Sequence, residues 1–372
     1  MKEVANKLAR EELIDMVPYQ SARRLHSKGN SSGSDSSTTA TQNKIWLNAN
    51  EASGPGDYQV NSNCINRYPD FQPENLMNAY SAYAQLSTEN ILATRGADEG
   101  IELVIRTFCK AYRDSILICP PTYGMYAISA ENHGAGIVKV PLIENQLDLE
   151  SIKAQVGKVK VVFLCSPGNP TGNLLSTDAI KSVLEMFGDN AIVVVDEAYI
   201  EFSPENSTVS WLKEYPQLVV LRTLSKAFAL AGLRCGFTLA NSDIITMLSK
   251  VIAPYPISAP VAEIASNSLA KTGLEQVRIR VQETIMLRQQ LSAWLTEQIW
   301  CESVYVSDAN FVLFKTATVE SKNFIFDCLK AHGILIRDQS KQLQLENCLR
   351  ISIGSERELS LLKQTITLAF NK

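Results

Sequence analysis

The chain has 372 residues, enough for two domains with sizeable cores, and its hydrophobic fraction of 45% is ordinary for a globular protein. The net charge of −4 argues against nucleic-acid binding, and no apolar run reaches the length of a membrane span. Eight cysteines without a C-x-x-C pair and three scattered histidines predict reduced thiols, a cytoplasmic location and no metal site.

The N-terminal part of the chain predicts a segment that precedes the main fold. An amphipathic helix is expected at 2–16, without the apolar core of a signal peptide. The Ser/Thr-rich stretch at 27–43 is typical of a flexible surface loop. Order returns at 44–51, an apolar run that contains Asn48 and Asn50. Turn chemistry explains paired asparagines well, so a functional role for them stays open at this point.

A candidate anion seat follows a predicted helix at about 73–86 and a short strand at 90–96. Gly96 permits a tight approach, and the free N–H groups at the start of the next helix could hold a phosphate. Asp98 in the first turn of that helix could equally be an ordinary cap. This stretch alone leaves both interpretations open.

Strand-like runs alternate with helical ones between 115 and 222. Near-continuous Val, Ile and Leu runs predict strands that are buried on both faces, as in a mostly parallel sheet covered by helices. Ligands of such sheets collect at the carboxyl ends of the strands. The side chains that follow strand ends, and that we expect to converge there, are Tyr123, Asn169, Asp196, Tyr199 and Lys226.

The C-terminal part predicts a smaller α+β domain. The Pro-rich stretch at 253–260 favours a crossing between domains, and a long helix is expected at about 272–299. A Ser-Glu-Arg-Glu capping box at 355–358 predicts the start of a final helix. Arg337 and Arg350 fall within or at the ends of its strands, where a surface ion pair would explain them as well as a binding role would.

Lys226 lies in the stretch 223–234, directly after a strand-like run. Small and apolar neighbours would lower the pKa of its amine and free it for Schiff-base chemistry. Ser225 and Arg234 are residue types that grip a phosphate. A lone Ser-Lys pair usually marks a solvated loop, but Asp196 ends another buried-looking strand thirty residues earlier and favours the chemical interpretation.

A carboxylate at the end of a buried strand needs a cationic or hydrogen-bonding partner, and the protonated ring nitrogen of pyridoxal phosphate supplies one. Asp196 would pair with that nitrogen. Lys226 would form the Schiff base to the cofactor and later move a proton between two carbons. Tyr199 and Asn169 could hydrogen-bond the phenolic oxygen of the ring, and Tyr123 could stack on its face.

The phosphate of this cofactor would be held by Ser225, Arg234 and the amides of Ala97 and Asp98. A dinucleotide fold is the rival interpretation, and it requires G-x-G-x-x-G directly after a first strand. The run Gly134-Ala-Gly136 precedes a strand and lacks the third glycine. We therefore reject the dinucleotide interpretation.

Short motifs are distributed over most of the chain. They are Leu47-Asn-Ala-Asn50-Glu, Arg67-Tyr68-Pro69, Arg95-Gly-Ala-Asp98-Glu-Gly, Pro120-Pro-Thr-Tyr123-Gly-Met-Tyr, Asn169-Pro-Thr-Gly172, Val195-Asp196-Glu-Ala-Tyr199, Thr223-Leu-Ser-Lys226-Ala-Phe and Leu349-Arg350-Ile. Through these motifs, over about residues 10–372, the chain resembles the fold-type I aminotransferases and most closely the histidinol-phosphate aminotransferase family.

The resemblance implies an α/β fold with a large domain, built on a mostly parallel sheet covered by helices, and a smaller α+β domain. We assign an N-terminal segment at 1–55 that joins the small domain and lines the site, a large cofactor-binding domain at 56–258 and a small domain at 259–372. The implied reaction moves an amino group between histidinol phosphate and 2-oxoglutarate, in two stages.

The resemblance also implies a homodimer, in which Tyr68 of one subunit reaches the cofactor phosphate of the other. Arg337 and Arg350 would bind the anionic end of either substrate, since a guanidinium fork suits both phosphate and carboxylate. The side chains implied on the imidazole side of the substrate are Tyr19, Tyr123 and Asn50.

Two features depart from the family pattern. Gly168 stands where asparagine is frequent, and the stretch 27–43 is longer than the usual connection. Related chemistry remains an alternative, such as that of a threonine-phosphate decarboxylase or an aromatic aminotransferase. A non-catalytic sensor that keeps the pocket is disfavoured, because the lysine is intact and no partner domain is attached.

Overall fold

The structure of the chain, a computed structural model, describes residues 44–54 and 65–370, together with the single positions 9, 10, 13, 16, 17, 56, 58 and 60. Most of the helix predicted at 2–16, the loop predicted at 27–43, and Tyr19 lie outside the described residues. Helix labels accordingly begin at α4.

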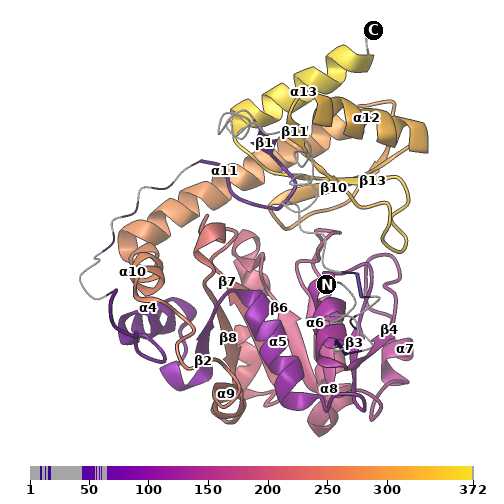
Figure 1. The fold of residues 1–372 in the computed structure, drawn as a ribbon. Coiled ribbons are helices and arrows are strands. Elements are labelled where there is room, and N and C mark those ends of the chain that lie inside the picture. The colour runs from indigo at the N-terminus through magenta and orange to yellow at the C-terminus, as the bar shows by residue number, and fades with distance from the viewer. Residues whose placement is uncertain are drawn as a thin grey trace.

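A seven-stranded sheet lies at the centre of the large domain (Figure 1). Its strands are β2 (Ile91–Thr94), β3 (Ser115–Ile118), β4 (Gly136–Lys139), β5 (Val161–Cys165), β6 (Ile192–Asp196), β7 (Leu218–Thr223) and β8 (Gly236–Ala240). The order across the sheet is β2-β8-β7-β6-β5-β3-β4, and only β8 runs antiparallel to its neighbours. The mostly parallel α/β sheet predicted from the sequence is confirmed.

Helices cover both faces of this sheet. One layer is formed by α5 (Ala97–Phe108), α6 (Met125–His133) and α9 (Ser242–Ser249), and the other by α4 (Glu74–Ala84), α7 (Leu149–Lys153), α8 (Thr177–Phe187) and α10 (Ala259–Ser268). Successive residues of a strand point to opposite faces. In β6, Val193 and Val195 accordingly pack with the layer of α4 and α8, whereas Val194 packs with the layer of α5 and α6.

The small domain contains a second, antiparallel sheet. Its strands, in the order β12-β13-β10-β9, are β12 (Arg337–Asp338), β13 (Cys348–Ser352), β10 (Phe311–Thr316) and β9 (Cys301–Val304). Its helices are α11 (Lys271–Thr296), α12 (Val319–Ala331) and α13 (Glu356–Phe370). The N-terminal strand β1 (Ile45–Trp46) pairs in parallel with β11 (Ile334–Leu335), so residues early in the chain lie within this domain.

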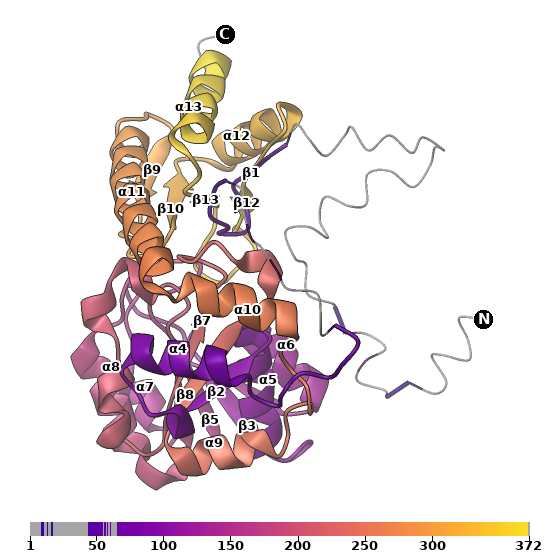
Figure 2. The same cartoon turned by 90° about the vertical axis from the view of Figure 1, so that its left-hand side faces the viewer.

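The connection between the domains is helical. In Figure 2, α10 lies beside α4 of the large domain. The next helix, α11, carries the chain from one core to the other, because Val277 belongs to the large-domain core and Leu291 to the small-domain core. The Pro-rich stretch that precedes α10 is therefore followed by a helix of the large-domain layer before the chain crosses.

Short 3-10 segments connect several of these elements. They are Thr88–Asn90, Gly188–Asn190, Ile200–Phe202, Pro204–Asn206, Val209–Lys213 and Ala231–Leu233. Among the residues that the structure describes, no helix combines the length and the apolar character that a membrane crossing needs, and no group of side chains could ligate a metal ion. The described cysteines are free thiols.

The start of α13 tests the capping box predicted at 355–358. The amide of Ser355 donates to Oε2 of Glu358 over 2.7 Å, and the amide of Glu358 donates back to Oγ of Ser355 over 3.3 Å. Replacing a serine cap by alanine costs about 1 kcal/mol. We expect Ser355→Ala to lower the free energy of unfolding by about that amount, measured by urea denaturation. Ser182→Ala within α8 is the matched control, and an equal loss in both variants would contradict the capping role.

Candidate active site

A cavity of about 320 Å³ lies between the carboxyl ends of β5, β6 and β7 and the small domain. Of the site residues that the sequence predicts, Tyr19 lies outside the described residues and Tyr68 does not line this cavity. All the others line it. A larger and more open hollow of about 740 Å³, beside Tyr112 and Arg113, contains none of them. The predicted convergence at the strand ends therefore holds in the fold.

Asp196 is the last residue of β6 and is only 3% exposed. The Tyr126 hydroxyl donates to its Oδ2 over 2.6 Å, and the Ala198 amide donates to its Oδ1 over 3.1 Å. Burial raises the pKa of the Asp196 carboxyl to about 6, although these two hydrogen bonds lower it. No cation in the described part of the chain forms an ion pair with Asp196, so this carboxyl group suits a cationic atom of a ligand.

Lys226 lies three residues beyond the end of β7 and reaches into the cavity. Its amine donates to the Ala49 carbonyl over 3.3 Å and lies 5.6 Å from the centre of the Tyr199 ring. Burial, together with the positive charge of Arg350, lowers the pKa of Lys226 to about 8. A neutral amine is therefore accessible near neutral pH, which nucleophilic and proton-transfer chemistry requires.

The Tyr199 hydroxyl is held by two amides. Asn50 donates to it over 3.0 Å and Asn169 over 3.2 Å, so both lone pairs of the oxygen are occupied. Arg350 in turn donates to Oδ1 of Asn169 and, over 3.3 Å, to the carbonyl of Asn48. The hydroxyl hydrogen of Tyr199 is thus left for a group within the cavity.

The N-terminus of α5 lies on the same cavity. No side chain caps this helix, and the preceding Gly96 has a φ of 86°. A Cβ on Gly96 would lie 2.8 Å from Nη2 of Arg234, so the close approach requires glycine. Arg234 contacts Oγ of Ser225 at 3.4 Å and pairs with Asp98 at 3.2 Å, and Tyr123 donates to Asp98 over 3.0 Å. Uncapped amides, a hydroxyl and a guanidinium together form a seat for a phosphate-like anion.

Two arginines face each other at the small-domain side of the cavity. Arg337 in β12 and Arg350 in β13 are direct partners across the antiparallel pair. Such partners point to the same face of a sheet, and like charges placed opposite each other are destabilising. Arg350 is only 7% exposed and both residues line the cavity, which favours a binding role over a role at the outer surface. A bound anion would relieve their repulsion.

The turn that carries Asn169 contains the departure at Gly168. The amide of Gly168 donates to the Asn173 carbonyl over 2.8 Å, and the amide of Gly172 donates to the Gly168 carbonyl over 2.8 Å. A Cβ on Gly168 would lie 2.5 Å from Oγ1 of Thr171. This chain therefore closes the turn with backbone contacts where a larger residue would need Thr171 to move.

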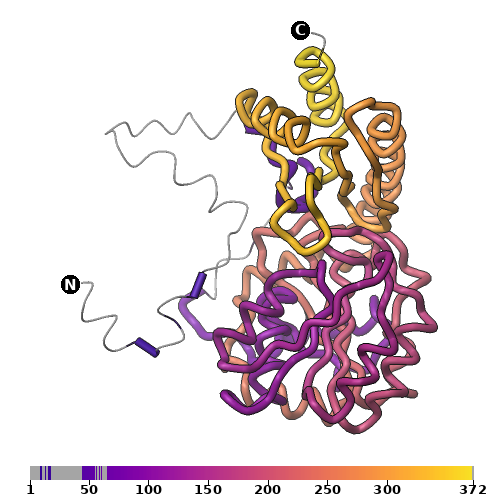
Figure 3. The backbone as a smooth tube through the Cα atoms, turned by 90° about the vertical axis from the view of Figure 1, so that its right-hand side faces the viewer, coloured from indigo at the N-terminus to yellow at the C-terminus, as the bar shows by residue number. Residues whose placement is uncertain are grey.

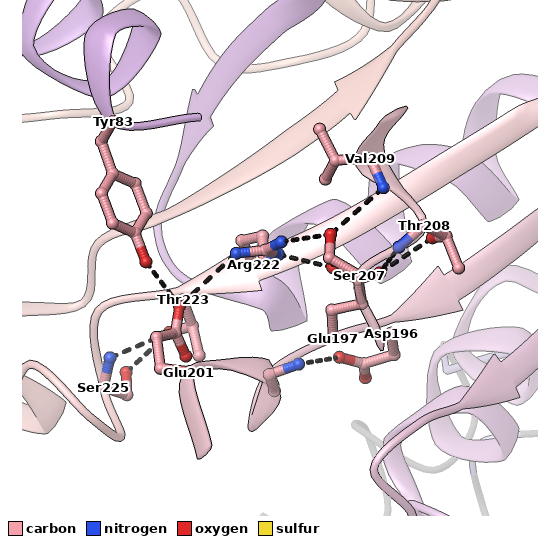
Figure 4. Close-up of polar contacts among 11 residues, drawn as sticks. Tyr83, Asp196, Glu197, Glu201, Ser207, Thr208, Val209, Arg222, Thr223 and Ser225 are labelled. Atoms are coloured by element: carbon pink, nitrogen blue, oxygen red, sulfur yellow. Dashed lines mark hydrogen bonds and ion pairs between the residues drawn. The ribbon is translucent and has the colours of Figure 1, made fainter. Parts of the chain in front are cut away.

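A buried ionic network lies behind the strand ends (Figure 4). Glu197 directly follows Asp196, and Arg222 directly precedes Thr223. The Glu197 carboxylate accepts from Nε of Arg222 over 2.7 Å, and Arg222 also donates to Oγ of Ser207 over 2.8 Å. The network therefore ties the turn that follows β6 to the end of β7, the two places from which Asp196 and Lys226 emerge.

A second carboxylate, Glu201, enters the same network. It lies 3.6 Å from Nη1 of Arg222 and accepts from the Tyr83 hydroxyl over 3.4 Å (Figure 4). One guanidinium cannot neutralise both Glu197 and Glu201. Burial raises the pKa of Glu201 to about 7, against the lowering effect of Arg222. The network therefore holds a proton that is released near neutral pH.

The sequence did not single out Tyr126, Gln339 or Gln342 as residues of the site. Tyr126 hydrogen-bonds Asp196, and Gln339 and Gln342 line the cavity beside the arginines. Tyr126 belongs to the motif at 120–126, but the sequence did not indicate which side chain it contacts. The two glutamines follow Arg337 in a loop with no recognisable pattern, so the sequence alone offered nothing to find them.

Comparisons with known proteins agree with this geometry. A family model described as "Aminotransferase class I and II" matches residues 33–366. The chain is 62% identical to the histidinol-phosphate aminotransferase of Colwellia psychrerythraea over 371 residues, which cover 97% of this chain and 99% of that protein.

Solved structures give the same result. The histidinol-phosphate aminotransferase of Clostridium acetobutylicum is similar with a TM-score of 0.76 and 27% identity, over 83% of this chain and 92% of that one. That of Sinorhizobium meliloti, solved in complex with pyridoxal-5'-phosphate, is similar with a TM-score of 0.77 and 25% identity, over 88% of this chain and 92% of that one.

The proton held by Glu201 predicts a pH-dependent stability. Folding raises the pKa of Glu201, so the folded state binds this proton more tightly than the unfolded state does. The stabilisation of the folded state by that proton is complete below the ordinary pKa of a glutamate and is lost as the pH rises through about 7. Between pH 5 and pH 8, the unfolding free energy of the wild type should fall by up to about 3 kcal/mol relative to that of Glu201→Gln. Denaturant unfolding at both pH values measures the difference. Glu205→Gln, at an exposed position, is the control. An identical pH response of wild type and Glu201→Gln would contradict the assignment.

Proposed function

The chain belongs to the class I and II aminotransferase family, and from that premise we propose that it moves the amino group, reversibly, between histidinol phosphate and 2-oxoglutarate in histidine biosynthesis. The products are imidazole acetol phosphate and glutamate. The observation that carries the proposal is one cavity that combines a lysine of lowered pKa, a buried carboxyl group without a cation among the described residues, and two opposed arginines.

The side chains of this cavity fit pyridoxal phosphate. The Asp196 carboxyl can receive a protonated ring nitrogen, and the Lys226 amine can react with the aldehyde. The uncapped N-terminus of α5 offers the amides of Ala97 and Asp98 to the phosphate, beside Ser225 and Arg234. The bound cofactor supplies an electron sink for the electrons that leave the α-carbon of the substrate.

The side chains around the ring have separate roles. Asp196 would keep the proton on the ring nitrogen, and Tyr126 would orient Asp196 through the hydrogen bond to Oδ2. Tyr199 would donate its hydrogen to the phenolic oxygen, because its lone pairs are already occupied by Asn50 and Asn169. Tyr123, which lines the cavity, would cover one face of the ring.

Once the substrate amine has displaced it, Lys226 would move the proton between the α-carbon of the substrate and the aldehyde carbon of the cofactor. A pKa of about 8 leaves part of the amine neutral near pH 7, and the free-energy cost of releasing a proton from the charged form is small. Its amine lies close to Arg350, which helps to keep the pKa low. The same cation would therefore assist both proton transfer and substrate binding.

Arg337 and Arg350 would bind the anion of whichever substrate is present. The phosphate of histidinol phosphate and a carboxylate of glutamate both match a guanidinium fork, and either one relieves the repulsion across β12 and β13. Asn50 and Tyr123 would contact the imidazole side of the substrate. Tyr19, which lies outside the described residues, is proposed to do so from the resemblance alone.

We also propose a homodimer with shared active sites. Tyr68 is 81% exposed, stacks on Tyr255 at a ring distance of 4.5 Å, and is absent from the lining of the cavity of its own subunit. The Arg234 side chain is 49% exposed, so the phosphate seat is open on one side. A second copy that brings Tyr68 to this opening would cover both surfaces.

The location and the division of the chain are proposals as well. Free thiols in the described part of the chain support a cytoplasmic location. Pairing of β1 with β11 supports an N-terminal segment at 1–55 that belongs with the small domain. The boundary between a large domain at 56–258 and a small domain at 259–372 stays a proposal, and α10 together with the start of α11 packs on the large-domain core. Nucleic acid and membrane are not among the proposed partners, because the net charge is −4 and the described helices include no membrane span.

An assay of the purified protein tests the proposed function. With histidinol phosphate and 2-oxoglutarate, the visible absorbance of the cofactor should change and glutamate should form. Release of carbon dioxide from threonine phosphate, without glutamate, would favour a decarboxylase instead. Preference for an aromatic amino donor over histidinol phosphate would favour an aromatic aminotransferase.

Lys226→Ala should abolish transamination, because no other amine of the described residues lines the cavity. Borohydride should fix the cofactor covalently on the wild-type chain and leave no adduct on the variant, as read by mass spectrometry. Lys250→Ala, at the end of α9, is the control and should keep both properties. Turnover retained by Lys226→Ala would refute the assignment.

Arg350→Ala should raise the KM of both substrates by at least about tenfold, because a hydrogen bond to a charged group contributes about 1.5–3 kcal/mol. Cofactor absorbance should be retained, since Arg350 lies at the small-domain side of the cavity. Steady-state kinetics in each direction measures the effect. Arg278→Ala, at an exposed ion pair of α11, should change neither KM. Unchanged KM values in Arg350→Ala would remove this residue from the site.

A further inference from the structure

Gln339 and Gln342 line the cavity beside the two arginines. Gln339 lies two residues after Arg337, and its amide donates to the Cys348 carbonyl over 3.0 Å, which continues the pairing of β12 with β13. Side chains two positions apart on an extended strand point to the same face. Gln339 therefore presents its side chain next to Arg337, at the anion-binding end of the cavity.

The side chain of Gln339 is buried but only partly satisfied. The residue is 5% exposed, and its Oε1 accepts a hydrogen bond from Nε2 of Gln342 over 2.9 Å. Within the described ranges, no group accepts a hydrogen bond from Nε2 of Gln339. This nitrogen is not one of the buried polar atoms that lack a partner, so it is accessible from the cavity, and it suits a ligand atom that accepts a hydrogen bond.

The loop that carries Gln339 is held at both ends. Lys322 binds the neighbouring Asp338 at 2.8 Å, and the amide of Gln342 donates to the Gln339 carbonyl over 2.9 Å. Farther along, Gln344 reaches the large domain and donates to the Leu142 carbonyl over 3.3 Å. Figure 3 shows this loop descending from the small domain onto the large one. The Gln339 amide is therefore positioned before a ligand arrives.

Phosphate needs more donors at this end than carboxylate does. A phosphate monoester has three terminal oxygens, whereas a carboxylate has two. Arg350 already donates from both terminal nitrogens, to Asn169 and to the Asn48 carbonyl. Two guanidinium groups match the two oxygens of a carboxylate, and a neutral third donor nearby favours the third oxygen of a phosphate.

We propose that Gln339 determines specificity by donating from Nε2 to the substrate phosphate, while Gln342 holds its amide in place. This inference rests on the function proposed above. It assigns discrimination between the two substrates to Gln339, because the glutamate carboxylate is served by the arginines alone.

Separate half-reactions test the proposal. Gln339→Leu removes the donor at similar length, and we expect kcat/KM for histidinol phosphate to fall about 10- to 100-fold, with the loss in KM. For glutamate the change should stay below about threefold. Gln339→Glu places a carboxylate against the phosphate and should impair histidinol phosphate more than Gln339→Leu does. An equal loss for both substrates, or no loss for either, would overturn the proposal.

Gln344→Leu is the matched control, because it removes a glutamine contact of the same loop outside the cavity. It should leave the ratio of kcat/KM values for the two substrates unchanged. If Gln344→Leu shifts that ratio as Gln339→Leu does, loop position explains the effect and the direct hydrogen bond is refuted.

Inorganic phosphate separates this inference from the proposed function. As a competitive inhibitor of the glutamate half-reaction, it should bind Gln339→Leu about tenfold more weakly than it binds the wild type. Weaker inhibition supports the assignment even if histidinol phosphate proves not to be a substrate. Equal inhibition of both proteins would overturn it, whichever amino donor the enzyme uses.

Discussion

A carboxyl group buried at the end of a strand, with no cation among the described residues to pair with it, is the constraint on which the site depends. Asp196 is kept there by Tyr126 from α6 and by the amide of Ala198. Burying a carboxylate in this way is costly, and the cost is met when a cationic group of a ligand arrives. The cofactor is thus part of the electrostatic balance of the large domain as well as its chemical reagent.

The parallel strands explain why this carboxyl group and Lys226 share one cavity. Because β6 and β7 are neighbours with the same direction, their last residues meet at one edge of the sheet. The network of Glu197 and Arg222 fixes that edge from behind, since each residue is adjacent in sequence to one of the two functional turns. Charged side chains with a structural role therefore lie next to the functional side chains in the same short segments.

Much of the fold and the site could be predicted from the sequence, for identifiable reasons. Asp196, Asn169 and Lys226 follow apolar runs, and the edge at which such runs end is fixed by the parallel arrangement. The antiparallel strand β8 went unpredicted, because its short run carries no sign of direction.

Side-chain partners were harder to predict than positions. The hydrogen bond from Tyr126 to Asp196 joins residues 70 positions apart, and only the packing of α6 against the sheet brings them together. Gln339 has no periodic pattern around it, so its burial beside Arg337 depends entirely on the loop between β12 and β13. The reach of Tyr68 depends on a second copy, which stays a prediction.

The pairing of β1 with β11 has a mechanical consequence. Asn50, although early in the chain, belongs to the small domain together with Arg350, whereas Asp196 and Lys226 belong to the large domain. A small rotation of one domain relative to the other would therefore move the residues that bind the two ends of a substrate at the same time. Binding and release of the substrate would then be coupled to this rotation, and α11 is the long helix that joins the two cores.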